Sequence, residues 1–237
     1  MRTLAALCLV GGLLAPLSSN ALVIVNSATD AARVNSLGTA LDNTNGGNTP
    51  TGYFPSSDDS TFNTSTAPDL STVSGLLGNW LGSPPSFNSN WSAPVQVAPN
   101  WPLFSELAVV YQFDTLGATN VVAKFGVDNG IYIWLDGVFQ TGHRAGGGPS
   151  LGEVTLNIGD LTAGTHFLQL ILEDHGAANG YVVEITADTF TPCSGPCPGP
   201  TPPSGVPIPS TLALLGIGLG ALAFSRRTKL EFAKTGR

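Results

Sequence analysis

Residues 121–137 read Val-Val-Ala-Lys-Phe-Gly-Val-Asp-Asn-Gly-Ile-Tyr-Ile-Trp-Leu-Asp-Gly, and this stretch decides the fold class. Apolar residues alternate through its first seven positions, as expected for a strand with one buried face. Asp128-Asn129-Gly130 follows, and Asn-Gly favours a two-residue hairpin turn because both residues tolerate a positive φ. Residues 131–135 then form a second strand, and Asp136-Gly137 provides another turn. The stretch therefore predicts antiparallel strand pairing.

The same alternation recurs at short spacing through the surrounding sequence. It is found in residues 107–113, 154–158, 168–172 and 181–185. About six short strands separated by turn residues are typical of an antiparallel β-sandwich. We therefore expect an all-β fold, a jelly-roll-like β-sandwich over residues 91–190.

Residues 22–90 predict an irregular, loop-rich region with short helices. Apolar residues at helical spacing favour a helix over residues 28–41 and a second over residues 70–81, with Asp69 as its N-cap. Between them, Asn, Ser, Thr, Gly and Asp dominate, which indicates long loops.

The two ends of the chain carry signals for export. Residues 1–21 fit a secretory signal peptide, with a basic start, an apolar run and a small-residue cleavage site. Residues 191–205 form a Pro/Gly/Ser-rich spacer, in which Cys193 and Cys197 are spaced for a small disulfide loop. Residues 206–237 form a tail, whose apolar run at 211–224 precedes a basic end. That run is predicted to form a transmembrane helix that crosses the inner membrane transiently, and a plain C-terminal anchor is the alternative.

Charge excludes one class of partner. The stretch between the two end signals holds three basic and fifteen acidic residues, a net charge of −12. Such a surface repels phosphate backbones, so we expect no nucleic-acid partner. It does offer carboxylates to divalent cations such as Ca²⁺.

The tail resembles the PEP-CTERM sorting signal of Gram-negative bacteria. Pro207-Ile208-Pro209 occupies the place of that family's Pro-Glu-Pro, without its Glu, and Arg226-Arg227 closes the apolar run. The resemblance implies export, transient anchoring in the inner membrane, and cutting by an exosortase-type protease that releases the protein to the cell surface or extracellular matrix. The partners it implies are the export machinery and that protease.

The core resembles galactose-binding-like modules and, in part, the PA14-type β-sandwich. The resembling residues are 125–137, then 161–168, then Glu173-Asp174-His175-Gly176. Such modules end one strand in Asp-Asn-Gly and carry an aromatic residue on the next.

Candidate ligand-binding residues follow from side-chain chemistry. Residues 143–149 predict a polar loop beside Trp134, and an aromatic ring with cationic and carboxylate neighbours suits sugar binding. The candidates are Trp134, Asp136, His143 and Arg144. Asp128, Glu173 and Asp174 are candidate ligands for calcium. The alternatives are that the Asp residues serve turns and that residues 143–149 only connect strands.

These observations lead to one hypothesis and two alternatives. We expect an exported, non-enzymatic surface or matrix protein that contacts extracellular polysaccharide. One alternative is a structural or adhesive protein of the envelope or biofilm that binds no sugar. The other is a secreted hydrolase, although no Gly-x-Ser-x-Gly motif is present.

Overall fold

The computed structural model describes residues 21–41, 65–174, 178–193, 195 and 197. The chain divides into two units, residues 1–199 and 200–237, and all described residues lie in the first. Its elements in chain order are β1 (Leu22–Asn26), β2 (Ala31–Gly38), the 3-10 helix η1 (Ser71–Val73), α1 (Ser74–Leu77), β3 (Val95–Gln96), β4 (Glu106–Leu135), β5 (Val138–Ala145), β6 (Val154–Leu161), β7 (Gly164–Glu173), β8 (Gly180–Ala187) and β9 (Thr189–Pro192).

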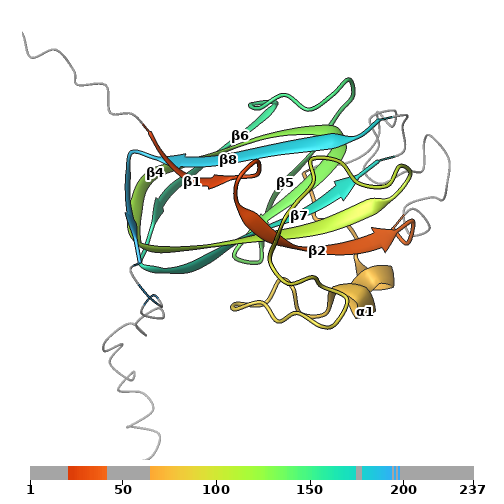
Figure 1. Cartoon of the computed structure of the whole chain (residues 1–237), viewed down its shortest axis with the longest axis horizontal. Helices are drawn as coiled ribbons and strands as arrows, with labels where there is room; N and C mark the ends of the chain where they lie inside the picture. The colour runs from red at the N-terminus through yellow and green to blue at the C-terminus, as the bar shows by residue number, and fades with distance from the viewer. Residues whose placement is uncertain (1–20, 42–64, 175–177, 194, 196, 198–237) are drawn as a thin grey trace, which may run out of the picture. The chain divides into compact units, whose positions relative to one another are not determined.

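One continuous strand, β4, builds both layers of the sheet (Figure 1). Its first part, residues 106–115, pairs with β2 and β7. Its middle part, residues 118–128, pairs with β6 and β8, and its last part, residues 130–135, pairs with β7 again and with β5. All of these pairings are antiparallel. The sheet therefore folds over into a larger layer, β3-β2-β4-β7-β4-β5, and a smaller one, β1-β8-β4-β6.

The main core lies between the two layers, where buried apolar side chains of β1, β2, β4, β7 and β8 meet. A buried hydrogen bond joins the two layers, because the hydroxyl oxygens of Tyr111 and Tyr181 lie 2.9 Å apart. The fully buried aliphatic and aromatic residues of this core include Val109, Val121, Phe125, Val127, Ile131, Ile133, Leu168, Leu170, Leu172, Val183 and Ile185.

A second core lies on the other face of the larger layer. Residues 65–92, including η1 and α1, cover that face (Figure 1) and bury a group of aromatic rings against it. Trp80 packs edge-on against Trp134 at 5.3 Å between ring centroids and stacks with Trp91 at 6.0 Å. The sheet residues that form its floor are Ala108, Val110, Tyr132, Trp134, Phe167 and Ile171. Both faces of the larger layer are therefore buried over much of their area.

The expectation of an all-β, antiparallel fold is confirmed, but the irregular region predicted for residues 22–90 is wrong in part. Residues 28–41 form no helix, because β2 spans most of them and pairs with β4. The helix was predicted from the helical spacing of the apolar residues, which would leave Asn35 on a polar face. In the structure Asn35 is buried, and its side-chain amide donates a hydrogen bond of 2.9 Å to the Leu76 carbonyl of α1. The sheet thus includes β1 and β2, which precede residue 91.

The helix predicted for residues 70–81 is shorter than expected. Only η1 and α1 form, and Leu70 occupies the N-cap position of η1. Asp69 still serves the start of η1, since its Oδ1 accepts 2.9 Å from the Ser71 amide, a bond that lowers the pKa of Asp69.

The two predicted turns have different outcomes. Asp136-Gly137 does close a hairpin between β4 and β5, with positive φ values of 51° and 79°. Asp128-Asn129-Gly130 does not form a hairpin turn, because β4 runs through it from one layer to the other. The flanking residues pair with β8 and β5 instead of with each other.

Other predictions fall on residues outside the described part of the chain. They include the signal peptide, most of the spacer and the whole sorting tail. Within the described ranges, the structure contains no helix whose length and hydropathy would let it cross a membrane.

Candidate functional site

Most of the predicted site residues meet at one end of the sandwich, here called the Asp128 end. It comprises residues 103–106, 128–130, 143–149, 173–174 and 178–180. Strand register brings them together: Arg144 lies opposite Gly130, Gly130 opposite Glu173, and Glu173 opposite Glu106. Opposite residues of antiparallel strands project to the same face, so these side chains form one row across four strand segments. Only Gly130, which has no side chain, stands between Arg144 and Glu173.

Two carboxylates hold the Gly-rich loop at this end. Asp128 is 5% exposed, and its Oδ2 accepts 3.1 Å from the Gly148 amide while its Oδ1 accepts from Asn129 Nδ2. Glu153 accepts from the Val127 amide at 2.9 Å and from the Ser150 amide at 3.0 Å. Bonds from backbone N–H groups to carboxylates are among the stronger protein hydrogen bonds. The loop that follows β5 is therefore fixed against β4.

A third carboxylate fixes an aromatic residue that the sequence reasoning missed. The Asp174 side chain is buried, and its Oδ2 accepts 2.7 Å from the backbone amide of Phe104. Phe104 has a φ of 56° and is 49% exposed. A bulky side chain with positive φ is uncommon, and here the side chain is exposed at the Asp128 end. The only sequence signal was the Trp-Pro-Leu-Phe run before β4, which fits no strand period.

His143 and Arg144 lie in strand β5, not in the polar loop predicted for residues 143–149. Both are half-buried. His143 lies opposite Ile131 of the inner face, and burial lowers its pKa, against a weaker opposing effect of Glu153. Arg144 projects to the opposite face, on which Tyr132 lies. Burial raises the pKa of Tyr132, and the charge of Arg144 lowers it by a smaller amount. The two neighbours therefore serve different faces of the layer.

Trp134 is not available as a sugar-stacking residue. It is 2% exposed and packs edge-on against Phe139 at 5.4 Å as well as against Trp80. The predicted ligand-binding role required the Trp134 ring to reach solvent, but residues 65–92 cover this face of the strand. Trp134 is a core residue of this fold.

Asp136 lies at the opposite end of the sandwich, where it anchors the turn. Its Oδ2 lies 2.8 Å from His166 Nδ1, and its Oδ1 accepts 2.8 Å from the Phe167 amide. The hydrogen bond to Asp136 is the main cause that raises the pKa of His166, partly offset by burial. These contacts give Asp136 a structural role and separate it from the other candidates.

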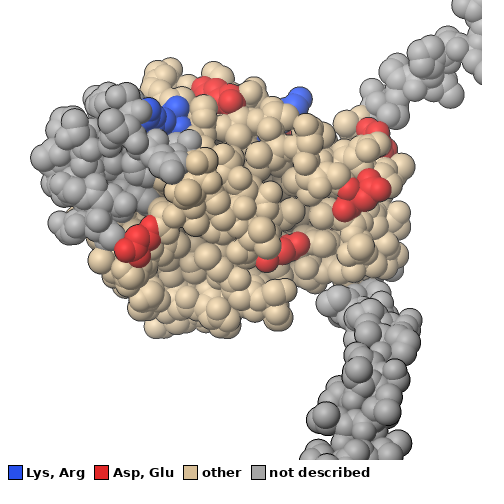
Figure 2. Space-filling view, turned by 180° about the vertical axis from the view of Figure 1, so that it is seen from behind, with Lys and Arg blue, Asp and Glu red and all other residues tan. Residues whose placement is uncertain are grey.

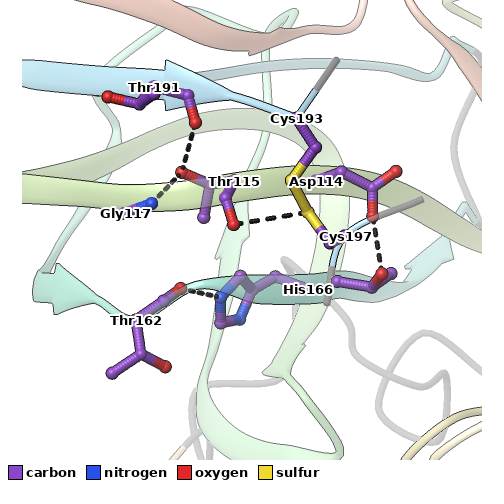
Figure 3. The surroundings of a disulfide bond; sticks show 9 residues. Asp114, Thr115, Gly117, Thr162, His166, Thr191, Cys193 and Cys197 are labelled. Atoms are coloured by element: carbon purple, nitrogen blue, oxygen red, sulfur yellow. Dashed lines mark hydrogen bonds between the residues drawn. A yellow bond between two sulfur atoms is a disulfide. The ribbon is translucent and has the colours of Figure 1, made fainter. Parts of the chain in front are cut away.

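The predicted cysteine pair lies at that opposite end as well (Figure 3). Cys193 and Cys197 form a disulfide after β9, with Cα atoms 5.6 Å apart. The Cys197 sulfur lies 3.4 Å from the Thr115 carbonyl, and Thr115 Oγ1 donates to the Thr191 carbonyl. The small loop is thus attached to β4 where that strand leaves the larger layer.

The three candidate calcium ligands do not form a cation site in this structure. Across the described ranges, no three His, Cys, Asp or Glu side chains are grouped as metal ligands would be. Asp128 and Asp174 each hold a loop amide. Calcium therefore stays a prediction.

Charged groups are sparse on the surface. On the face shown in Figure 2, acidic side chains are scattered singly and basic ones are scarce. Most of the described surface in this view therefore carries no charged side chain.

Comparison with known proteins gives no family for this chain. No family model and no curated protein matches it. Among solved structures, the β-glucuronidase from Ruminococcus gnavus in complex with D-glucuronic acid is 12% identical, with a TM-score of 0.34, over 50% of this chain and 27% of that one. The PA14 sugar-binding domain from an RTX adhesin is 15% identical, with a TM-score of 0.25, over 44% and 56%. The PA14 domain of the MpAFP antifreeze protein is 16% identical, with a TM-score of 0.28, over 55% and 64%. Similarity at this level does not allow the function of those proteins to be assigned to this chain.

Proposed function

We propose that this chain is an exported, non-enzymatic protein of the cell surface or extracellular matrix, and that its β-sandwich binds polysaccharide at the Asp128 end. The observation that carries the proposal is the exposed side chain of Phe104, whose backbone amide is held by a hydrogen bond to buried Asp174. An aromatic ring held beside polar groups offers a sugar both a stacking surface and hydrogen-bond partners.

The preorganisation of this end supports binding. Asp128 and Glu153 fix the loop after β5, and Asn179 exchanges two hydrogen bonds with the Trp101 backbone. A site whose loops are already held loses less conformational entropy when a ligand binds. His143 and Arg144 lie near the end of β5, shortly before the fixed loop.

Export and processing rest on the two ends of the chain. The predicted signal peptide and the PEP-CTERM-like tail favour passage through the inner membrane, transient anchoring and release by an exosortase-type protease. Fractionation of cells that express the full chain or a form lacking residues 206–237 tests this part. Retention in the membrane only for the full chain supports it, and identical distribution of both forms contradicts it.

A glycan array with the full-length chain tests the binding part, in the presence and in the absence of Ca²⁺. Binding that Phe104→Ala and Arg144→Gln both weaken supports the proposal. Loss of binding without Ca²⁺ would add a metal to the site.

A structural or adhesive protein without sugar binding is the second candidate. One observation favours it: both oxygens of Asp128 and both of Glu153 already bond within the chain. Because those carboxylates already accept hydrogen bonds that stabilise loops, they contribute less to ligand binding than exposed carboxylates would. A silent glycan array, together with adhesion of cells that depends on the chain, would select this alternative.

A further inference from the structure

We propose a second ligand site, independent of the Asp128 end, that takes a sugar ring bearing a carboxylate, a hexuronate. It is a cavity of about 220 Å³ on the outer face of the larger layer, beside the edge of the cover formed by residues 65–92. The cavity is lined by Ala31, Ala32, Arg33, Phe87, Pro94, Val110, Gln112 and Phe167.

The strand register gives the cavity its floor. Arg33 of β2 lies opposite Val110 of β4, and Gln112 of β4 lies opposite Phe167 of β7. Val110 and Gln112 are two residues apart on one strand, so all four side chains project from the same face. Phe87 stands over this floor from the covering segment.

Arg33 is held in place before any ligand arrives. Its guanidinium carbon lies 4.9 Å from the centroid of the Phe87 ring, and its Nη1 donates 3.0 Å to the Ser92 carbonyl. That bond uses one of the five N–H donors of an arginine. A guanidinium fixed in this way presents a planar fork that matches a carboxylate.

The charges around the cavity select an anion. None of the described residues that line the cavity is acidic, although the stretch between the end signals has a net charge of −12 and only three basic residues. Arg33 is one of those three. A carboxylate bound to Arg33 therefore meets no negative charge among the described lining residues, which favours an anionic over a neutral ligand.

The rest of the lining fits a single sugar ring. The volume lies below the roughly 300–1,000 Å³ of sites for drug-sized ligands, so it accommodates one ring and not a long chain. Phe87 and Phe167 offer apolar contact to the ring, and the exposed amide of Gln112 can donate to and accept from its hydroxyls. The same carboxylate can belong to a free monosaccharide or to the end of an acidic polysaccharide.

Calorimetric titration of the full-length chain tests this site. The ligands are D-galacturonate, D-glucuronate, a short oligogalacturonate and, as neutral isosteres, D-galactose and D-glucose. We expect at least one hexuronate to bind at least tenfold more tightly than its neutral isostere. Tighter binding of the oligomer identifies the polysaccharide end as the source, and equal binding identifies the free sugar.

Matched variants separate the site from the fold. Arg33→Gln is expected to weaken hexuronate binding at least tenfold, and Gln112→Ala at least twofold. Lys124→Gln removes a cation from the other layer and should leave hexuronate binding unchanged. Gln112 is exposed, so its variant tests the site even if Arg33→Gln unfolds the protein. The proposal is overturned if no hexuronate binds, if neutral sugars bind equally well, or if Gln112→Ala and a folded Arg33→Gln bind as the wild type does. Phe104→Ala alters only the Asp128 end, so failure of the two sites can be told apart.

Discussion

His166 Nδ1 lies 2.8 Å from Asp136 Oδ2, and this contact joins strand β7 to the turn between β4 and β5. The hydrogen bond to Asp136 is the main cause that raises the pKa of His166 above its usual value near 6.5, and burial lowers the pKa by a smaller amount. Because the folded state binds the proton more tightly than the unfolded state, the pair stabilises the protein most when the histidine is charged.

The Asp136–His166 contact predicts a pH dependence of stability. The contribution is fully present below the unfolded pKa of His166 and is lost as the pH rises through its higher folded pKa. Asp136→Asn removes the charge but keeps an oxygen for the Phe167 amide and tolerates the positive φ. Between about pH 5.5 and about pH 8.5, the wild type should therefore lose more thermal stability than the variant, as thermal unfolding at the two pH values measures. An identical pH dependence in both would contradict this reading. The variant is the necessary reference because burial lowers the pKa of His143, whose contribution has the opposite sign.

The hydroxyl pair between the layers predicts a strongly non-additive mutant cycle. Tyr181→Phe leaves the buried Tyr111 hydroxyl without its partner, which should cost about 1–3 kcal/mol, whereas removing both hydroxyls should cost less than the two single variants together. Urea unfolding of the four proteins measures this, and simple additivity would argue against the bond.

The same pair predicts an alkaline titration. Burial raises the pKa of Tyr111 to about 12, and burial raises that of Tyr181 further. We expect both phenols to stay protonated in the folded state at about pH 11 and to ionise only on unfolding. Ultraviolet absorbance at rising pH, followed alongside circular dichroism, measures this. Ionisation of these tyrosines well before loss of structure would show that they reach solvent.

Trp134 separates a core role from a ligand role. Because it packs against Trp80 and Phe139 at 2% exposure, Trp134→Ala should lower the free energy of unfolding by about 3–5 kcal/mol. Trp134→Phe should cost less and leave glycan binding intact. Normal stability with lost binding would restore Trp134 as a ligand-binding residue.

The disulfide predicts a small effect on stability and none on binding. The bond joins residues four positions apart, and closing so short a loop restricts the unfolded chain by about 2 kcal/mol at most. Replacing both cysteines with serine should therefore lower stability modestly. Loss of ligand binding in that variant would be unexpected, because the Asp128 end lies at the other end of the strands.

Local sequence signals predicted the strands well because each strand has to bury one face. The alternation in residues 121–127 and 168–172 needs no knowledge of partners. Asp136-Gly137 was also predictable, since both residues accept a positive φ. Asn-Gly at 129–130 carried the same local signal and gave a wrong turn, because the pairing of its flanks with β8 and β5 outweighed it.

The candidate site depended on information that no local pattern contains. The sequence placed Glu173 and Asp174 near a strand end, but only the pairing of β7 with two parts of β4 brings Glu173 beside Gly130 and Glu106. Covering of the outer face by residues 65–92 likewise removed Trp134 from solvent. Phe104 lies in irregular backbone whose conformation comes from a bond to Asp174, seventy residues away in sequence.

Polysaccharide binding by Phe104→Ala, compared with Leu116→Ala, tests the central claim most directly. Both residues are 49% exposed, but Leu116 lies where β4 leaves the larger layer at the opposite end from Phe104. On a glycan array with full-length proteins of equal thermal stability, we predict at least tenfold weaker binding for Phe104→Ala and wild-type binding for Leu116→Ala. Equal binding by both variants, or none by the wild type, would contradict the proposed site.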